Sequence, residues 1–198
     1  MIKSGQLIVF EGLDAAGKTT QAEFFMGGSD VLVSHQPSGA PGIGKQIYQL
    51  TEGTIELNPT ARQFLHLACH AQHWQDELLP ALASGKSVLL DRFWWSTVAY
   101  GYFDGEVANG RMTPQEFMDM VQLTMPSRLK PSIVFYFNSP YAEDRHNTER
   151  LVRGYEWLAS YLSHPNNIQY PIYRVPMGNM KEVHTWIMGV LKEEGILQ

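Results

Sequence analysis

The segment GLDAAGKT at residues 12–19 constrains the fold of this chain more than any other, because it fits the pattern G-x-x-x-x-G-K-[ST]. Gly12 and Gly17 allow the backbone to curl, so that successive N–H groups point inward around a chain of phosphates. Lys18 can then reach the β- and γ-phosphates of ATP, and the Thr19 hydroxyl can ligate Mg²⁺. A strand-like apolar run precedes the segment and a helix-forming run follows it, which is the context that this pattern requires. We therefore expect a P-loop that binds ATP through Gly12, Leu13, Asp14, Ala15, Ala16, Gly17, Lys18, Thr19 and Thr20.

Short apolar runs recur along the rest of the chain and alternate with amphipathic segments. The expected strands are Leu7–Phe10, Val31–Val33, Val88–Leu90, Ile133–Phe137 and Tyr173–Val175. The expected helices are Lys18–Met26, Pro59–Ser84, Thr113–Thr124, Tyr141–Leu162 and Asn179–Glu194. Continuous apolar runs between helices indicate a parallel sheet covered on both faces. The sequence therefore predicts an α/β fold of the P-loop NTPase type, with a doubly wound parallel five-stranded sheet and helices on both faces.

Length and charge limit the remaining possibilities. A chain of 198 residues fits one domain, which we expect to span residues 1–198. The net charge of −5 argues against binding a nucleic acid polymer over the whole surface. No apolar stretch approaches the roughly 18 residues of a membrane span, and the single Cys69 suits a reducing compartment. We expect a cytoplasmic protein with no membrane partner.

Charged residues follow the third expected strand. Asp91 ends the run VLLD, where a P-loop enzyme places the acid that holds Mg²⁺. Arg92 comes next and can clamp a phosphate with two parallel hydrogen bonds. Asp14 lies inside the P-loop itself. On residue chemistry alone it is equally well interpreted as a turn former or as a contact to hydroxyls of the phosphate acceptor.

Longer stretches of the chain resemble the thymidylate kinase family. They are FEGLDAAGKTTQ at Phe10–Gln21, AQHWQDELLPALASGKSVLLDR at Ala71–Arg92, STVAYG at Ser96–Gly101 and, more loosely, HQPSGAPGIG at His35–Gly44. The resemblance covers the first half of the chain well and the second half poorly. The P-loop is shared by many families, whereas Asp-Arg-aromatic followed by Ser-x-x-Ala-Tyr is more specific. The resemblance implies transfer of the ATP γ-phosphoryl group to a deoxypyrimidine monophosphate, foremost dTMP giving dTDP, with Mg²⁺.

Site residues also follow from the resemblance. Asp14 would contact the 3′-hydroxyl of the deoxyribose, and Arg92 would bind the acceptor phosphate. Pro37 would follow a cis peptide bond that shapes the acceptor site. The nucleoside pocket would be lined by Ser96, Tyr100 and Gln72. The family also pairs through a helical face, so apolar groups in residues 64–82 and 94–102 lead us to expect a homodimer.

The chain departs from the family pattern around the base. His66 stands where the family has a stacking Phe, and His70 where it has the Arg that reads the pyrimidine edge. Gly101 replaces a Gln, and His35 and Gln36 replace an Arg-Glu pair. The spacing of His66 and His70 could hold zinc, but no Cys or carboxylate is positioned to complete such a site. The resemblance places this helix face against the nucleobase, so we assign His66 and His70 to substrate binding. A pyrimidine with a polar 5-substituent is the second candidate substrate.

The lid is shorter than the family's. The segment 140–153 passes almost directly from a strand to a long helix, and its Asp-Arg pair is what remains of a basic lid. Ala15 and Ala16 stand where some relatives carry a catalytic Arg in the P-loop. Members without that Arg supply one from the lid. We therefore assign catalysis to Lys18, Arg92 and Arg145, with Arg150 and Arg153 as alternatives to Arg145.

Three other functions stay open on the sequence. A deoxynucleoside kinase would use a carboxylate base, but no Glu-Arg-Ser pattern follows a strand. A polyphosphate-dependent kinase shares elements such as DAAGK and DRFWW, yet the negative net charge and the short chain weigh against it. A degenerate P-loop protein would bind nucleotide without catalysis. Intact Lys18, Thr19, Asp91 and Arg92 argue against it, and the short lid keeps it open.

Overall fold

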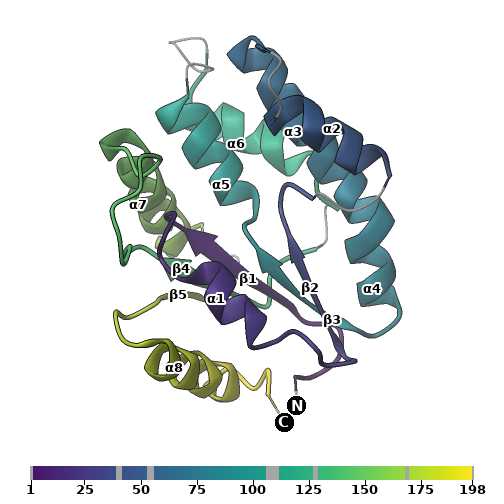
Figure 1. Cartoon of the computed structure of the whole chain (residues 1–198), viewed down its shortest axis with the longest axis vertical. Helices are drawn as coiled ribbons and strands as arrows, with labels where there is room; N and C mark the ends of the chain where they lie inside the picture. Colours follow the sequence, from purple (N-terminus) through teal and green to yellow (C-terminus); the bar gives the residue numbers. More distant parts are fainter. Residues whose placement is uncertain are drawn as a thin grey trace.

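The fold is built on a sheet of five parallel strands in the order β2-β3-β1-β4-β5 (Figure 1). The computed structural model describes residues 2–38, 42–52, 56–105, 112–126, 129–167 and 170–197. The strands are β1 Leu7–Gly12, β2 Val31–His35, β3 Ser87–Asp91, β4 Ile133–Phe137 and β5 Ile172–Arg174. Phe10 lies beside Asp91 and Gly12 beside Phe137 in the register, so the carboxyl ends of β1, β3 and β4 meet at one edge. The expected α/β fold is confirmed.

Helices connect the strands. They are α1 Lys18–Glu23, α2 Ile43–Glu52, α3 Pro59–His73, α4 Leu79–Ala83, α5 Trp94–Val98, α6 Pro114–Gln122, α7 Glu149–Ser163 and α8 Met180–Glu193. Two stretches of π-helix, η1 Trp74–Leu78 and η2 Ala99–Asp104, continue α3 and α5. Side-chain caps fix several starts: Asn58, Thr113, Thr148 and Asn179 each accept a hydrogen bond from a first-turn N–H group.

Both faces of the sheet are buried, as aromatic contacts along β4 show. Phe135 packs edge-on against Trp186 of α8, with ring centroids 6.0 Å apart. The next residue, Tyr136, lies near Trp95 of α5 and stacks on Tyr155 of α7. Successive side chains of a strand point to opposite faces. Helix α8 therefore covers one face and α5 with α7 covers the other, which agrees with the layers in Figure 1.

Several predicted boundaries were wrong. The helix expected over Tyr141–Leu162 begins only at Glu149, because Thr148 caps it by accepting from the N–H of Leu151 and the preceding segment bonds to the P-loop instead. The sequence patterns also failed to predict α2 and the helical turns of α5 and η2. The expected loops at residues 36–44 and 103–110 lie partly outside the described residues, at 39–41 and 106–110.

Candidate functional site

The P-loop begins where β1 ends. Gly12 has φ +130°, and a Cβ at this position would lie 2.1 Å from the carbonyl oxygen of Phe137, so only glycine fits. Lys18 is buried, and its Nζ donates to the carbonyl oxygens of Gly12 at 3.1 Å and Leu13 at 2.5 Å. Burial and the nearby Arg92 lower the pKa of Lys18 to about 8. The amino group therefore lies inside the loop that the sequence assigned to phosphate.

Thr19 and Asp91, the two predicted metal ligands, meet at the sheet edge. The Thr19 hydroxyl donates to Oδ2 of Asp91 at 2.8 Å. The other carboxylate oxygen, Oδ1, is buried and has no hydrogen-bond partner among the described residues. An orphaned carboxylate oxygen beside a hydroxyl is suited to Mg²⁺, which prefers oxygen ligands and keeps several waters. Among the described residues, no three His, Cys, Asp or Glu side chains form a metal cluster.

Arg92 occupies the centre of the site. Its backbone is left-handed, with φ +68°, an uncommon conformation that neighbouring contacts must hold. Its Nη1 donates to the carbonyl oxygen of Gly12 at 3.2 Å, to Ser96 Oγ at 3.1 Å and to Tyr155 Oη at 3.2 Å. Its Nη2 is paired with the Asp14 carboxylate. Burial opposes the charge of Arg92, but Tyr155, Tyr100 and Asp14 raise its pKa, so it stays cationic.

Glu11, which the sequence analysis missed, holds this turn in place. Its fully buried carboxylate accepts from the N–H groups of Phe93 at 2.7 Å and Ser96 at 3.0 Å, and from the Ser96 hydroxyl at 2.8 Å. These donors follow Arg92 by one and four residues in the chain. Burial raises the pKa of Glu11, while the bonds from Ser96 and the charge of Arg92 oppose that shift. The only signal in the sequence is an acid at the end of the apolar run LIVF.

Asp14 links the P-loop to the neighbouring cavity. Its carboxylate pairs with Arg92 and accepts a hydrogen bond from the Tyr100 hydroxyl. Burial works against ionisation of Asp14, but Arg92 and the Tyr100 hydroxyl hold its pKa below the ordinary value. An ionised carboxylate at this wall can accept from a sugar hydroxyl.

A cavity of about 780 Å³ opens beside Arg92 and is large enough for a nucleotide; we call it the acceptor cavity. It brings together seven predicted substrate residues: Asp14, Pro37, His66, His70, Arg92, Ser96 and Tyr100. The Gln36–Pro37 peptide bond is cis. Gln72 is not among the described residues that line the cavity, and its amide donates instead to Asp76 at 2.7 Å. Gln36 and Gln63, which the sequence analysis did not assign to the site, also line the cavity.

The two predicted histidines lie on the α3 wall of this cavity. His70 is buried, and its Nε2 lies 3.3 Å from the Thr97 hydroxyl. Burial, with smaller contributions from His66 and His73, lowers the pKa of His70 to about 3. His70 is therefore neutral at physiological pH. It can exchange one hydrogen bond with a ligand but cannot replace the permanent charge of an arginine.

The lid segment rests on the P-loop. The backbone N–H of Tyr141 donates to the carbonyl oxygen of Ala15 at 2.9 Å. Asn147 donates from Nδ2 to the carbonyl oxygen of Asp14 at 2.8 Å and accepts at Oδ1 from the Asp14 N–H at 2.9 Å. Arg145, the predicted lid catalyst, is exposed, and its Nε donates to Nε2 of His146, which lines the acceptor cavity.

A second cavity lies on the other side of the P-loop. It measures about 270 Å³ and is lined by Ala16, Gly17, Thr20, Gln21, Phe137, Tyr141, Gly178, Asn179, Met180 and Val183. The Tyr141 hydroxyl closes one wall by donating to the carbonyl oxygen of Gly178 at 2.7 Å. The Gln21 amide donates to the carbonyl oxygen of Met180 at 2.9 Å, while its Oε1 is buried without a partner among the described residues.

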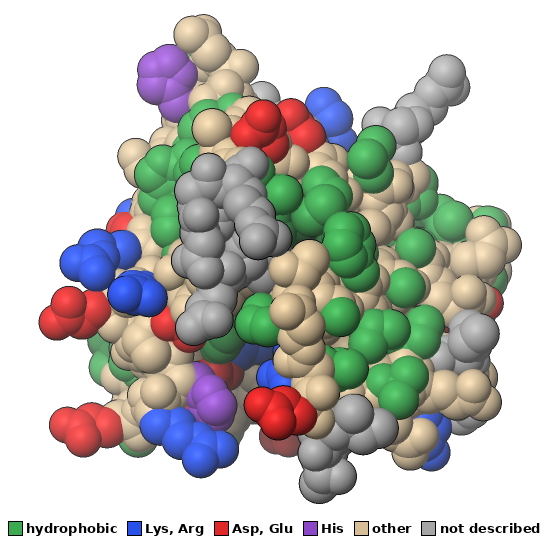
Figure 2. All heavy atoms as spheres, turned by 90° about the horizontal axis from the view of Figure 1, so that it is seen from above, with side chains coloured by type: hydrophobic (Ala, Val, Ile, Leu, Met, Phe, Trp, Pro, Cys, Tyr) green, Lys and Arg blue, Asp and Glu red, His purple; other side chains and the backbone are tan. Residues whose placement is uncertain are grey.

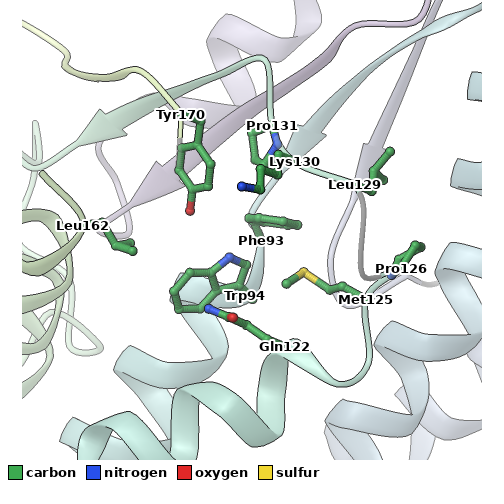
Figure 3. Close-up of a pocket in the computed structure, with 10 residues that line it drawn as sticks. All are labelled: Phe93, Trp94, Gln122, Met125, Pro126, Leu129, Lys130, Pro131, Leu162 and Tyr170. Atoms are coloured by element: carbon green, nitrogen blue, oxygen red, sulfur yellow. The ribbon is translucent and has the colours of Figure 1, made fainter. Parts of the chain in front are cut away.

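A third cavity, of about 90 Å³, contains no P-loop residue among those that line it (Figure 3). Its labelled side chains come from the start of α5 and the residue before it, from the end of α6, from the segment before β4, from Leu162 of α7 and from Tyr170, and most are apolar. Phe93 lines both this cavity and the acceptor cavity. We assign no part of the reaction to the third cavity.

Comparison with known proteins agrees with this arrangement. The family model for thymidylate kinase matches residues 10–160. The chain belongs to the thymidylate kinase family. The expected class, an ATP-dependent dTMP kinase, is thereby confirmed.

Individual relatives cover most of the chain. The thymidylate kinase of Pelotomaculum thermopropionicum is 35% identical over 158 residues, covering 75% of this chain and 68% of that protein. That of Parasynechococcus marenigrum is 30% identical over 154 residues, covering 71% and 70%. Solved thymidylate kinases from Ehrlichia chaffeensis and Candida albicans share the fold, with TM-scores of 0.73 and 0.72. They are 22% and 19% identical and cover 96% and 99% of this chain, and 99% and 95% of their own chains.

Proposed function

We propose that this chain transfers the γ-phosphoryl group of ATP to the 5′-phosphate of a deoxypyrimidine monophosphate, with dTMP as the first candidate and dTDP as the product. One observation carries the proposal at the level of the site. The guanidinium of Arg92 touches the P-loop at Gly12 and also lines the acceptor cavity. A cation at that junction lies where donor and acceptor phosphates must approach each other.

On the donor side, the P-loop would hold the phosphates of ATP. Lys18, which now bonds to two loop carbonyls, would turn its amino group to the β- and γ-phosphates. Mg²⁺ would be held by Thr19 and Asp91 and would neutralise charge on the phosphates. The 270 Å³ cavity beside the loop would take the adenine, and the buried Oε1 of Gln21 can accept from its amino group.

On the acceptor side, Arg92 would bind the monophosphate and Asp14 the 3′-hydroxyl. An oxygen of the acceptor phosphate attacks the γ-phosphorus in line, and the bond between that phosphorus and the bridging oxygen of ADP breaks. The protein forms no covalent bond and contributes position and positive charge. Lys18, Arg92 and one lid arginine would share the charge that develops in transfer.

The lid arginine stays a prediction. Arg145 is our first choice, because its neighbour His146 already lines the acceptor cavity. Arg150 and Arg153 are exposed on α7, and Arg153 makes only a 3.9 Å ion pair with Glu149 on its own helix. Neither the Arg145–His146 hydrogen bond nor the Arg153–Glu149 ion pair would prevent the arginine side chain from turning toward bound phosphates.

A panel of acceptors tests the proposed function. Turnover should be measured side by side for dTMP, dUMP, 5-substituted dUMP, dCMP, dAMP, dGMP and thymidine, with ATP and Mg²⁺. We expect dTMP, or a pyrimidine with a polar 5-substituent that bonds an imidazole, to be the best acceptor. Activity on thymidine without activity on any monophosphate would make the chain a nucleoside kinase. A clear preference for a purine would mean that the base pocket has been misinterpreted.

A homodimer and a cytoplasmic location complete the proposal. Phe64 of α3 and Leu123 after α6 are large apolar side chains with more than half of their surface exposed. Seen from above, hydrophobic side chains gather on the side of the molecule that holds α2 and α3 (Figure 2). Such a surface favours a partner. Among the described residues, no helix has the length and apolar character to cross a membrane. Nucleotide substrates and a buried free thiol at Cys69 support the location.

A further inference from the structure

Gln63 of α3 is a buried amide with an unused donor at the wall of the acceptor cavity. Its side chain lines that cavity and is 6% exposed. Its Nε2 has no hydrogen-bond partner among the described residues. A buried amide N–H without a partner lowers stability, so its retention needs a reason. A ligand that fills the cavity and accepts from Nε2 would supply one.

The amide of Gln63 lies where a side chain from η2 would otherwise project. A Cβ at Gly101 would lie 2.2 Å from Oε1 and 3.1 Å from Nε2 of Gln63. The absence of a side chain at residue 101 is therefore what allows the Gln63 amide to occupy this space. Gly101 itself lines the cavity. Gly101 leaves the space open and Gln63 of α3 fills it, so the polar group at this part of the cavity wall is the Gln63 amide.

The position of Gln63 on its helix assigns it to the base and not to the phosphates. It precedes His66 and His70 by three and seven residues, a spacing that puts all three on one face of α3. Gln36, the other buried amide of the cavity, lies instead at the sheet edge, where its backbone N–H donates to the carbonyl oxygen of Asp91. The nearby His70 already shares Nε2 with Thr97.

We infer that Gln63 reads the hydrogen-bonding edge of the pyrimidine and sets the choice between thymine and cytosine. This inference rests on the proposed function. The donor Nε2, which has no partner among the described residues, complements O4 of thymine. At the same position cytosine carries N4–H₂, which donates and does not accept, so the unpartnered donor of Gln63 favours thymine.

A substitution that changes the charge of Gln63 distinguishes a role in recognising the pyrimidine from a role in packing the protein. Gln63→Glu leaves the size unchanged and replaces the donor with an acceptor. It should lower kcat/KM for dTMP by about tenfold to a hundredfold, because a carboxylate then faces O4, and should lower kcat/KM for dCMP much less. The ratio of the two values is measured at pH 8.5, so that the introduced carboxyl is ionised. Gln63→Leu should lower kcat/KM for dTMP, since it removes the donor to O4.

Gln75→Glu is the matched control, because Gln75 is exposed on η1 and the same chemical change there should leave the ratio as in the wild type. Circular dichroism and urea midpoints confirm that each variant is folded. A ratio within threefold of the wild type in folded Gln63→Glu overturns the inference and assigns Gln63 to packing. If the wild type phosphorylates no monophosphate, the proposed function fails as well.

Gly101→Ala is a second test, for the case that Gln63→Glu does not fold. Its methyl group would overlap the Gln63 amide and displace it, so kcat/KM for dTMP should fall while Gln63 itself is unchanged. Added to Gln63→Leu, the same substitution should cause little further loss, since the amide that it displaces is gone. Independent, multiplying losses in the double variant would contradict a shared amide and overturn the inference.

Discussion

Replacing His70 with glutamine should remove a large part of the acid sensitivity of folding. In the native state His70 is buried against Thr97, and burial lowers its pKa to about 3. In the unfolded chain a histidine takes up its proton near pH 6.5. Between these two values the unfolded state binds more protons than the native state. The free energy of unfolding therefore falls as the pH falls below about 6.5.

The size of the effect follows from these two pKa values. At pH 5.5 the unfolded state gains about 1.4 kcal/mol from protonating His70, whereas at pH 7.5 it gains less than about 0.1 kcal/mol. The figure at pH 5.5 is nearly the same for any native pKa below about 4.5. Glutamine can keep a hydrogen bond to Thr97 and does not titrate. The variant should therefore lose about 1.4 kcal/mol less stability than the wild type between the two pH values.

Urea unfolding followed by tryptophan fluorescence at pH 7.5 and 5.5 measures this difference, since the chain has five tryptophans. His73, whose pKa burial also lowers, remains in both proteins and cancels in the comparison. His164→Gln, a change at an exposed histidine after α7, is the control and should behave as the wild type. An equal loss of stability in wild type and His70→Gln would show that His70 is not held neutral in the native state. The description of His70 as a neutral side chain on the α3 wall of the acceptor cavity would then be wrong.

Two further predictions concern the P-loop and the assembly. Lys18→Ala should lower turnover by at least about a hundredfold, because it removes a preorganised positive charge from the phosphates; turnover within a few-fold of the wild type in a folded variant would contradict the P-loop assignment. Sedimentation at micromolar concentration should give a species of twice 22.4 kDa, because the apolar surface around Phe64 favours a second copy. A single species at 22.4 kDa would reject the homodimer.

Local patterns predicted the frame of this molecule well. The strands β1, β3 and β4 are continuous apolar runs with fully buried residues, so their composition carries the signal. The P-loop and the pair Asp91 and Arg92 follow such runs directly, which made them predictable too. Helix α2 follows a Gly/Pro-rich segment that reads as loop, and its start could not be recognised.

The supporting residues could not be predicted because their partners are distant in the chain. Glu11 acts through Phe93 and Ser96, which lie 82 and 85 residues away. Gln63 acquires its place from the missing side chain of Gly101. Neither pairing leaves a periodic pattern. By contrast, Gln72 was assigned to the base by resemblance, while the structure gives its amide a partner one turn along its own helix.

The contact between Asn147 and the backbone of Asp14 has a consequence for modularity. One side chain satisfies both the N–H and the carbonyl of a P-loop residue 133 positions earlier. These two hydrogen bonds fix the position of residue 147 relative to the P-loop, much as backbone hydrogen bonds fix the register of two neighbouring strands. A chimaera that exchanges residues 140–153 for the corresponding segment of a relative removes the Asn147 partner of that N–H and carbonyl unless the graft also supplies an amide at the matching place. Residues 140–153 and the P-loop of this chain are therefore coupled through backbone hydrogen bonds, and an exchange of one segment has to preserve the amide that joins it to the other.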